Sequence, residues 1–390
     1  MRMLMLSHGY PPTISGVTLV VQKISRAMVS RGHEVTVVTA SETKRGYQDE
    51  DQGVRLIRLH ALPNPFWKEG PIPYIRQGEL EAIVDEFQPD LIHTHENVIL
   101  SRQLLRLKKT QVVPRVSSCY FLPRYVTHYL RWPGLKGLLE KLIWRIAIRN
   151  LNQYDHTIFS TSSQEHDYLE HGLCVPSTVI SNGVDAVRYH STNGREQEIE
   201  NRYALPPGPR LLFVGRLAKD KKIDLLIQAM AKLDHQQSAH LLIVGRGDDR
   251  ARLEELVEKL EVGERVHFLG FVPEEDLPAI YRASDIFTIA SICEVQSIPT
   301  LQATVSGLPI VAANAAALPE LVEDQGNGRL VPPDDPQAIS EAVQYILANP
   351  QRKKSFGEVS LEIGRPHAQE FTFQQYETFY RQVVNNFPKG

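Results

Sequence analysis

The chain has 390 residues with 42% hydrophobic side chains, enough for two domains of ordinary size that each bury a core. Its formal net charge of −3 joins a basic first half to an acidic second half. This composition excludes a disordered chain. The confinement of positive charge to one segment, without stacking motifs, argues against a nucleic-acid-binding protein.

The cysteines and the apolar runs indicate where the protein resides. Cys119, Cys174 and Cys293 have no spacing typical of a disulfide framework or a zinc site. The N-terminus enters an apolar strand without a signal-peptide pattern, and no apolar run approaches the ~20 residues that span a bilayer. We therefore expect a cytoplasmic protein with reduced thiols.

The first 189 residues alternate short apolar strands with amphipathic helices, which is typical of a parallel sheet covered on both faces. The predicted strands cover residues 2–7, 34–39, 54–59, 91–95, 112–118, 157–160 and 178–180. The predicted helices cover residues 17–30 and 77–87. This pattern predicts a first α/β domain with a parallel sheet over residues 1–189.

Two loops of this domain carry candidate ligand-binding residues. The loop before the first helix has one glycine at its tip, Gly16, which either lets the backbone approach a phosphate or forms an ordinary turn. The strand at residues 91–95 ends in His95, at the edge where open α/β sheets bind ligands. His95 is therefore either a substrate contact or a structural histidine.

Basic side chains concentrate in residues 97–154, where Glu140 is the single acid. Within this segment, residues 131–149 repeat apolar side chains at helical spacing, with tryptophans and cations beside them. Such a helix is typical of an interfacial membrane element, and an ordinary domain helix with solvated charges is the alternative. The membrane interpretation predicts contacts with an anionic membrane surface by Trp132, Lys136, Lys141, Trp144, Arg145 and Arg149.

A second round of strands and helices follows a polar stretch, residues 190–209, which we expect to be a linker. The predicted strands cover residues 210–214, 240–244, 266–269, 285–289 and 310–313, and the predicted helices cover 223–232, 250–260, 273–282 and 339–347. This alternation predicts a second doubly wound α/β domain over residues 210–370. A C-terminal helix within residues 371–390 is long enough to pack on the first domain.

The stretch from Phe287 to Val322 holds the strongest ligand-binding signal. A short apolar strand precedes a polar turn with one carboxylate, Glu294, and a helix opens near Pro299. A helix that begins just beyond a parallel strand directs unpaired N–H groups at the crevice, which suits a phosphate. Glu294 and Gln302 would flank that anion with groups that bind hydroxyls of ribose and sugar.

Six motifs follow one another along the chain: SNGVD (181–185), GRLAKDKKID (215–224), SxxE (291–294), SGLPIVA (306–312), ALPELV (317–322) and NGRLVPPDDP (327–336). In this order and spacing they resemble glycosyltransferase family 4, retaining nucleotide-sugar transferases of the GT-B fold. The resemblance covers nearly the whole chain. It implies two facing Rossmann-like domains, with the donor held mostly by the second and the acceptor by the first, and it implies no metal or other cofactor.

The resemblance assigns roles to residues at matching positions. It implies that Arg216 and Lys221 bind the donor diphosphate and that Glu294 binds hydroxyls of the donor sugar. A guanidinium and an ammonium beyond a strand end would neutralise the leaving phosphate, whereas a solvated basic turn is the alternative for this run. The other residues expected to bind the donor are Gly16, Gly245, Val295, Gln296, Ser297 and Ile298.

Two positions depart from the family pattern. Gln302 stands where the family has the second glutamate of its E-x7-E motif, which binds ribose; an amide still exchanges hydrogen bonds with hydroxyls but removes a negative charge. Tyr120 stands where the family often has a histidine near the reacting sugar. Either Tyr120 replaces it as a further catalytic group, or the alignment is off by a residue or two, or the acceptor chemistry differs.

The resemblance implies a front-face displacement in which the leaving phosphate deprotonates the incoming hydroxyl. We expect transfer of a hexosyl group from a UDP-sugar, which is the preferred donor on family frequency alone, to a membrane lipid such as diacylglycerol. The lipid is expected because of the basic helix at residues 131–149 and because EVQS after Cys293 is similar to a pattern of some diacylglycerol glucosyltransferases. The protein would then work at the inner face of the cell membrane. The alternatives are a soluble glycan or small-molecule acceptor, or nucleotide-sugar binding without turnover.

Overall fold

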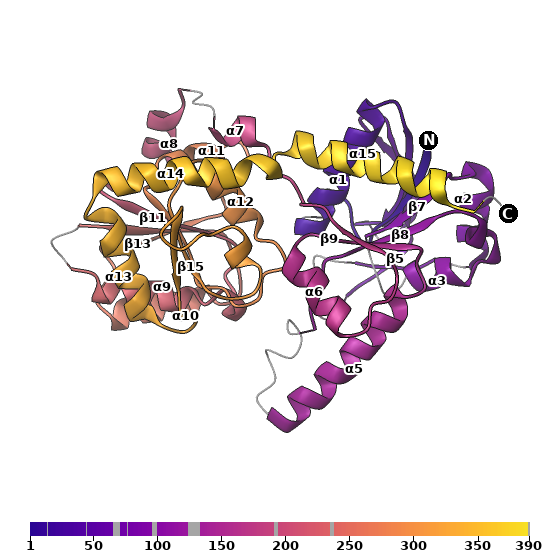
Figure 1. The fold of residues 1–390 in the computed structure, drawn as a ribbon. Helices are drawn as coiled ribbons and strands as arrows, with labels where there is room; N and C mark the ends of the chain where they lie inside the picture. The colour runs from indigo at the N-terminus through magenta and orange to yellow at the C-terminus, as the bar shows by residue number, and fades with distance from the viewer. Residues whose placement is uncertain are drawn as a thin grey trace. The chain divides into compact units, whose positions relative to one another are not determined.

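Two compact units make up the fold (Figure 1). The computed structural model describes residues 1–13, 15–43, 45–64, 71–75, 77–95, 100–123, 133–190, 194–234 and 238–388, without the side chains of residues 77 and 133–136. The first unit comprises Met1–Asn182 together with Glu370–Gly390, and the second comprises Gly183–Gln369.

The first unit is built on an eight-stranded sheet in the order β10-β9-β8-β7-β1-β2-β4-β3. Its strands are β1 (Arg2–Leu6), β2 (Glu34–Ala40), β3 (Tyr47–Asp51), β4 (Val54–Leu59), β7 (Leu91–Thr94), β8 (Arg115–Cys119), β9 (His156–Phe159) and β10 (Ser177–Val179). Neighbouring strands are parallel except for the antiparallel pair β3 and β4. Met3 and Met5 of β1 enter one core while Leu4 and Leu6 enter another, so apolar packing covers both faces.

The helices of the first unit connect these strands. They are α1 (Gly16–Ser30), α2 (Gln77–Phe87), α3 (Leu100–Arg106), the 3-10 helix η1 (Lys108–Val112), α5 (Pro133–Leu151), α6 (Ser162–Glu170) and α15 (Gln369–Asn386), and a small antiparallel pair joins β5 (Ala61–Leu62) to β6 (Ile72–Pro73). A capping box between Ser15 and Thr18 starts α1 by satisfying backbone N–H groups at both positions.

The C-terminal helix α15 is part of the first unit, on whose sheet it packs (Figure 1). Tyr376, Phe379 and Tyr380 are buried with Met3 and Met5 in the core on that face. Between Tyr376 and Phe379 lies the partly exposed Glu377, whose carboxylate lies 3.2 Å from His33 and 3.5 Å from Arg31. The last helix therefore completes the core of the unit that contains the first strand.

The second unit has a six-stranded, all-parallel sheet in the order β13-β12-β11-β14-β15-β16. The strands are β11 (Arg210–Val214), β12 (His240–Val244), β13 (Val266–Gly270), β14 (Ile286–Ile289), β15 (Ile310–Ala313) and β16 (Gly328–Val331). The helices are α7 (Ala186–His190), α8 (Glu196–Arg202), α9 (Ile223–Lys232), α10 (Arg250–Lys259), α11 (Leu277–Arg282), α12 (Ile298–Val305), α13 (Pro336–Leu347) and α14 (Pro350–Gly364), with the 3-10 turns η2 (Lys219–Lys221), η4 (Leu318–Glu320) and η5 (Arg365–His367). This strand order is that of a doubly wound dinucleotide-binding fold.

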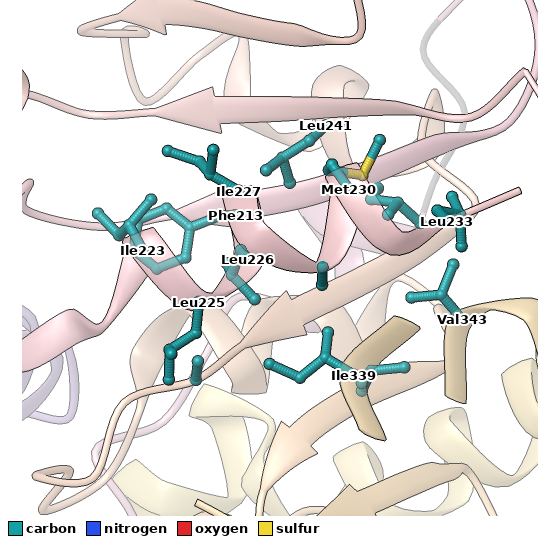
Figure 2. Close-up of a cluster of buried hydrophobic side chains, with 14 of the residues drawn as sticks. Phe213, Ile223, Leu225, Leu226, Ile227, Met230, Leu233, Leu241, Ile339 and Val343 are labelled. Atoms are coloured by element: carbon teal, nitrogen blue, oxygen red, sulfur yellow. The ribbon is translucent and has the colours of Figure 1, made fainter. Parts of the chain in front are cut away.

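The core on one face of the second sheet positions the start of α9 (Figure 2). Ile223, Ile227 and Met230 of α9 are buried with Phe213 of β11 and Leu241 of β12. Because only Lys222 separates Ile223 from the η2 turn, this packing determines where the preceding loop leaves the sheet.

Three details differ from the elements predicted from sequence in residues 108–119 and 273–282. Val112, where a strand was predicted to begin, is the last residue of η1, and β8 begins at Arg115 because Pro114 has no N–H for the sheet ladder. Residues 273–276 form a turn, so α11 begins at Leu277. The strands β3, β5, β6 and β16 and the helices α3, α6, α7, α8 and α14 were not predicted.

The predicted linker, residues 190–209, lies inside the second unit, and the division between units falls after Asn182 rather than after residue 189. This stretch contains α8, which is held by the buried carboxylate of Asp276. Asp276 accepts hydrogen bonds from Arg195 at 3.1 Å, Arg202 at 2.7 Å and Tyr203 at 2.9 Å. These charge-assisted bonds attach a polar segment that has little apolar surface of its own.

Candidate functional site

The sheet of the second unit reverses its strand order between β11 and β14, which are hydrogen-bonded neighbours. Chain connections leave these two strands in opposite directions, so a crevice opens beyond their carboxyl ends, where α/β sheets of this kind bind ligands. The loop after β11 carries Arg216 and Lys221, and the loop after β14 carries Glu294. The topology therefore brings together three residues that the sequence analysis singled out.

Glycines let the loops at this edge pass close to one another. Gly245 has φ +134°, and a Cβ at this position would lie 1.9 Å from the carbonyl oxygen of Gly215. A Cβ at Gly247 would lie 2.1 Å from the carbonyl oxygen of Leu217. Side chains are excluded at both positions, so Gly245 has a packing reason for being glycine that is independent of the expected donor contact.

The loop after β11 turns back on itself through η2. Leu217 is fully buried, whereas the Arg216 side chain is 64% exposed and lies 3.2 Å from the Asp220 carboxylate. Asp220 is 6% exposed and lies 3.8 Å from the ammonium of Lys221. The loop thus holds two cations around one buried carboxylate.

The loop after β14 is buried along most of its length. Ser291 donates a hydrogen bond to the Asp220 carbonyl oxygen at 3.3 Å, which ties this loop to the one after β11. Ser297 caps α12 by accepting a hydrogen bond from the N–H of Thr300 at 3.3 Å. Val295, Gln296 and Ser297, expected to line a diphosphate, precede the helix, and Ile298 is its first residue.

A short ion pair joins the two loops. The ammonium of Lys221 donates a hydrogen bond to Glu294 at 2.7 Å, and the two side chains are 20% and 10% exposed. Burial alone would lower the pKa of Lys221, but the neighbouring Glu294 carboxylate outweighs this effect and holds the pKa above its usual value. Lys221 therefore keeps its positive charge at neutral pH, beside the carboxylate that holds it.

Gln302 is 7% exposed and its amide is bound at both ends. Its nitrogen donates to the hydroxyl of Tyr189 at 2.6 Å, and its oxygen accepts from the hydroxyl of Tyr281 at 3.0 Å. The Tyr281 hydroxyl also lies 3.1 Å from the carbonyl oxygen of Pro299. The amide oxygen keeps one lone pair and the amide nitrogen one N–H with which a ligand could form hydrogen bonds. The expected contact with ribose is compatible with this arrangement and stays a prediction.

The sheet of the first unit reverses its order between β1 and β7, and His95 directly follows β7 at this edge. His95 Nδ1 lies 3.1 Å from the Tyr120 hydroxyl, and burial lowers the pKa of His95 to about 3. His95 Nε2 is buried and has no hydrogen-bond partner among the residues that the structure describes. The two predicted acceptor-side residues are thus in contact, with one imidazole nitrogen unused.

His93 lies beside this pair and has a structural role. Its two ring nitrogens contact the Tyr380 hydroxyl at 2.7 Å and the Ser118 hydroxyl at 2.8 Å. Burial, followed by the neighbouring His95, holds the pKa of His93 well below its usual value. Gly16 is the first residue of α1, and a Cβ there would meet no atom within 4 Å, so packing does not require glycine at this position.

The helix α5 separates the predicted membrane residues into two groups. Trp144 is 8% exposed and stacks on His171, with ring centroids 3.8 Å apart, so its predicted membrane contact is wrong. Lys141, Arg145 and Arg149 are exposed and make no ion pair with any residue in the described part of the chain. Trp132 and the side chain of Lys136 lie outside the described residues.

Three residues near the second site were missed in the sequence. Asp220 contacts both candidate cations, and its i, i+4 spacing from Arg216 was a usable signal within the run read as basic. Tyr189 and Tyr281 form hydrogen bonds with Gln302, although they lie 113 and 21 residues before it in the sequence. No local sequence pattern predicts either contact.

Within the ranges that the structure describes, no three or more His, Cys, Asp or Glu side chains are grouped to hold a metal ion. No helix in those same ranges combines the length and the apolar character needed to cross a membrane.

Comparison with protein families gives two matches that together span most of the chain. The description "Glycosyltransferase Family 4" matches residues 14–188, and "Glycosyl transferases group 1" matches residues 195–361. Among curated proteins, an uncharacterized glycosyltransferase of Methanocaldococcus jannaschii is 28% identical, with 90% of each chain covered. The sulfoquinovosyl transferase of Arabidopsis thaliana is 26% identical, covering 90% of this chain and 67% of the relative. The alpha-monoglucosyldiacylglycerol synthase of Acholeplasma laidlawii is 23% identical, covering 99% and 98%.

Solved structures show the same fold. The Anabaena protein HepE in complex with UDP has a TM-score of 0.78 at 19% identity, covering 98% of this chain and 100% of the other. A sucrose-phosphate synthase from Thermosynechococcus elongatus has a TM-score of 0.80 at 23% identity, covering 99% and 100%.

Proposed function

Because the chain belongs to glycosyltransferase family 4 and has the GT-B fold, we propose that it transfers a hexosyl group, with retention, from a UDP-sugar to a hydroxyl of a membrane lipid. The proposed sugar-nucleotide donor is supported by the ion pair between Lys221 and Glu294, which lies where the strand order of the second sheet reverses. In this pair an ammonium, which would bind phosphate, lies beside a carboxylate, which would accept hydrogen bonds from sugar hydroxyls.

The choice of a UDP-sugar is supported by the structural relatives. HepE has been solved with UDP, with UDP and glucose, and with UDP-glucose. In this chain, the backbone N–H groups at the start of α12 and the cations of the loop after β11 would receive the diphosphate. Glu294 would accept hydrogen bonds from hydroxyls of the sugar.

The proposed reaction needs no nucleophile from the protein. The bond from the anomeric carbon to the diphosphate oxygen breaks, and a bond to the acceptor oxygen forms on the same face. The proton of the acceptor hydroxyl passes to the departing diphosphate oxygen. Arg216 and Lys221 would stabilise the negative charge on that leaving group, while His95 and Tyr120 would orient the acceptor hydroxyl.

The lipid acceptor is supported by two relatives that are named alpha-monoglucosyldiacylglycerol synthase, and by the exposed surface of α5. Leu138, Leu142 and Ile146 follow one another at i, i+4 spacing and are 69%, 51% and 48% exposed. Figure 1 shows the N-terminal part of this helix extending beyond the other elements of the first unit. Unsatisfied apolar surface of this kind suits the boundary between headgroups and acyl chains.

The cations of α5 lie beside this apolar row, also at i, i+4 spacing. They line a groove of about 620 Å³ whose other walls include Trp144 and His171. The lining cations are Lys141, Arg145 and Arg149. Each would contribute about 1 kcal/mol of attraction near an anionic leaflet.

The donor proposal is tested by thermal shift against UDP-, GDP- and ADP-sugars. Only a ligand that binds the native state raises the melting temperature, so UDP-glucose or another UDP-sugar is expected to stabilise the protein by mass action. Stabilisation by a GDP-sugar or an ADP-sugar alone would show that the nucleobase of the donor is guanine or adenine and not uracil. Binding without transfer to any acceptor would favour the alternative of a nucleotide-sugar-binding protein.

The acceptor proposal is tested with vesicles. The parent is expected to float with vesicles that contain anionic lipid and to transfer radiolabelled sugar into their diacylglycerol, whereas the triple variant Leu138→Ser/Leu142→Ser/Ile146→Ser should lose both. Val187→Ser, which removes a 73% exposed side chain from the second unit, is the matched control. Label recovered only in water-soluble product would instead support a soluble acceptor.

A further inference from the structure

The charged side chains at the switch point of the second sheet balance one another without a ligand. Arg216 pairs with Asp220 at 3.2 Å, and Lys221 pairs with Glu294 at 2.7 Å. The side chains of Asp220 and Glu294 are 9% and 10% exposed, so water reaches little of either carboxylate. If one of these cations moves to a ligand, its carboxylate therefore remains buried without that hydrogen-bond partner, which is unfavourable.

The two ion pairs differ in what happens to the carboxylate when its cation binds a ligand. Asp220 belongs to the same loop as both cations and remains 3.8 Å from Lys221. Glu294 lies on the other loop, 73 residues further along the chain, and Lys221 is the one partner recorded for its carboxylate in the described structure. When a phosphate takes the ammonium, Glu294 needs new hydrogen-bond donors.

We propose that Glu294 competes with the donor diphosphate for Lys221, and that the sugar of the donor relieves this competition by donating its hydroxyl hydrogen bonds to the released carboxylate. This inference rests on the proposed function and adds a specificity role to it. A nucleoside diphosphate, which is the product, brings the phosphates but no sugar hydroxyls. Glu294 then favours the donor over the product and favours release of the product after transfer.

The test compares UDP with UDP-glucose by isothermal titration of the full chain, in the parent and in Glu294→Gln. The variant keeps the shape of the side chain but removes the charge that holds Lys221. We expect the Kd of UDP to fall about tenfold, because UDP no longer has to take Lys221 away from a buried negative charge. The Kd of UDP-glucose should fall much less, because the variant also loses the carboxylate that binds the hydroxyls.

Asp334→Asn is the matched control, because it breaks the neighbouring ion pair between Lys222 and Asp334, 2.8 Å long, at the exposed end of the same turn. It should change neither Kd by more than twofold. If Glu294→Gln does not fold, as judged by its thermal melt, Glu294→Ala is measured in its place with the same expected change for UDP.

Two results would overturn the inference: a Kd for UDP that stays the same or rises in the variant, or Kd values for UDP and UDP-glucose that fall equally. Both leave the proposed function intact, because the parent still binds and transfers the sugar. If thermal shift selects another base, the diphosphate and the sugar nucleotide of that base are used. A parent that binds none of these sugar nucleotides would remove the proposed function itself.

Discussion

In the candidate donor site of the second unit, the side chains contact residues that lie far away in the sequence. Lys221 meets Glu294, and Gln302 meets Tyr189, each across a loop or helix boundary. These contacts occur among buried groups, where a polar atom that loses its partner is costly because water cannot replace it. Substitutions here should therefore change stability as well as ligand affinity.

Replacing Gln302 with leucine should lower the free energy of unfolding by about 1–3 kcal/mol. The buried hydroxyl of Tyr189 would lose its partner at 2.6 Å, whereas Tyr281 would keep the carbonyl oxygen of Pro299 at 3.1 Å. Urea unfolding measures the change. Gln337→Leu, which removes an exposed side chain that donates to Glu341 at 3.0 Å, is the control, and an equal loss in both variants would contradict the prediction.

The buried histidines of the first unit should make stability depend on pH. The pKa of His95 is lowered to about 3 by burial, whereas an unfolded histidine titrates near 6.5. Below pH 6.5 the unfolded chain therefore binds a proton that the folded chain does not. The stability contribution is complete above pH 6.5 and falls by about 1.4 kcal/mol per pH unit as the pH drops toward 3.

The measurement is the free energy of unfolding in urea between pH 7.5 and pH 5. His95→Asn removes this titration, so its stability should decline less steeply than that of the parent over the same range. Other buried histidines, including His93, remain in both proteins and cancel in the comparison. Identical slopes for the two proteins would show that His95 does not contribute.

At the level of elements, α5 combines an anchored face with an unpartnered one. Trp144 stacks on His171 and meets Tyr168 edge-on at 4.8 Å, while Leu138 and Leu142 stay exposed on the same helix. The sequence pattern showed that the helix is amphipathic, but it could not show which apolar residues face the protein. Tryptophan was assigned to the membrane side, and the structure assigns it to the core.

Trp144→Ala should therefore destabilise the first unit by about 3–5 kcal/mol, as expected for truncation of a buried aromatic side chain. Urea unfolding measures the loss. Leu169→Ala on the neighbouring helix α6, where the side chain is 47% exposed, should cost well under half as much. Vesicle binding by the folded fraction of Trp144→Ala should persist, because its exposed apolar row is unchanged.

Sequence patterns predicted the elements that carry continuous apolar runs or clear helical spacing. The boundaries predicted for β4, β11, β12, β15 and α9 agree with the structure. The helix α8 was missed because, apart from Ile199, its side chains are polar, and its support from Asp276 comes from another part of the chain. The site was predicted residue by residue from the family resemblance, whereas the pairing of Lys221 with Glu294 required the fold.

For the molecule as a whole, the two units differ in how their chain segments are arranged. The second unit is one continuous segment, Gly183–Gln369, whereas the first needs both Met1–Asn182 and Glu370–Gly390. Without the last segment, the first unit would expose the core that Tyr376 and Tyr380 fill. Independent folding is therefore expected of the second unit only.

This difference predicts the behaviour of two fragments. Residues 183–369 expressed alone should unfold cooperatively on heating, as followed by circular dichroism. Residues 1–182 alone should lack a cooperative transition and bind an apolar dye, because His93 also loses the Tyr380 hydroxyl at 2.7 Å. Adding residues 370–390 through a flexible linker should restore the transition. Cooperative melting of residues 1–182 by themselves would contradict the prediction.

The return of α15 to the first unit also determines the order in which the protein can mature on the ribosome. The strands β1 to β10 emerge before the second unit, yet the helix that covers one of their faces is translated after it. The second unit can fold while the first unit still has an uncovered apolar surface. During synthesis the earlier-made half is therefore the later to finish, and it is the half that a chaperone would need to protect.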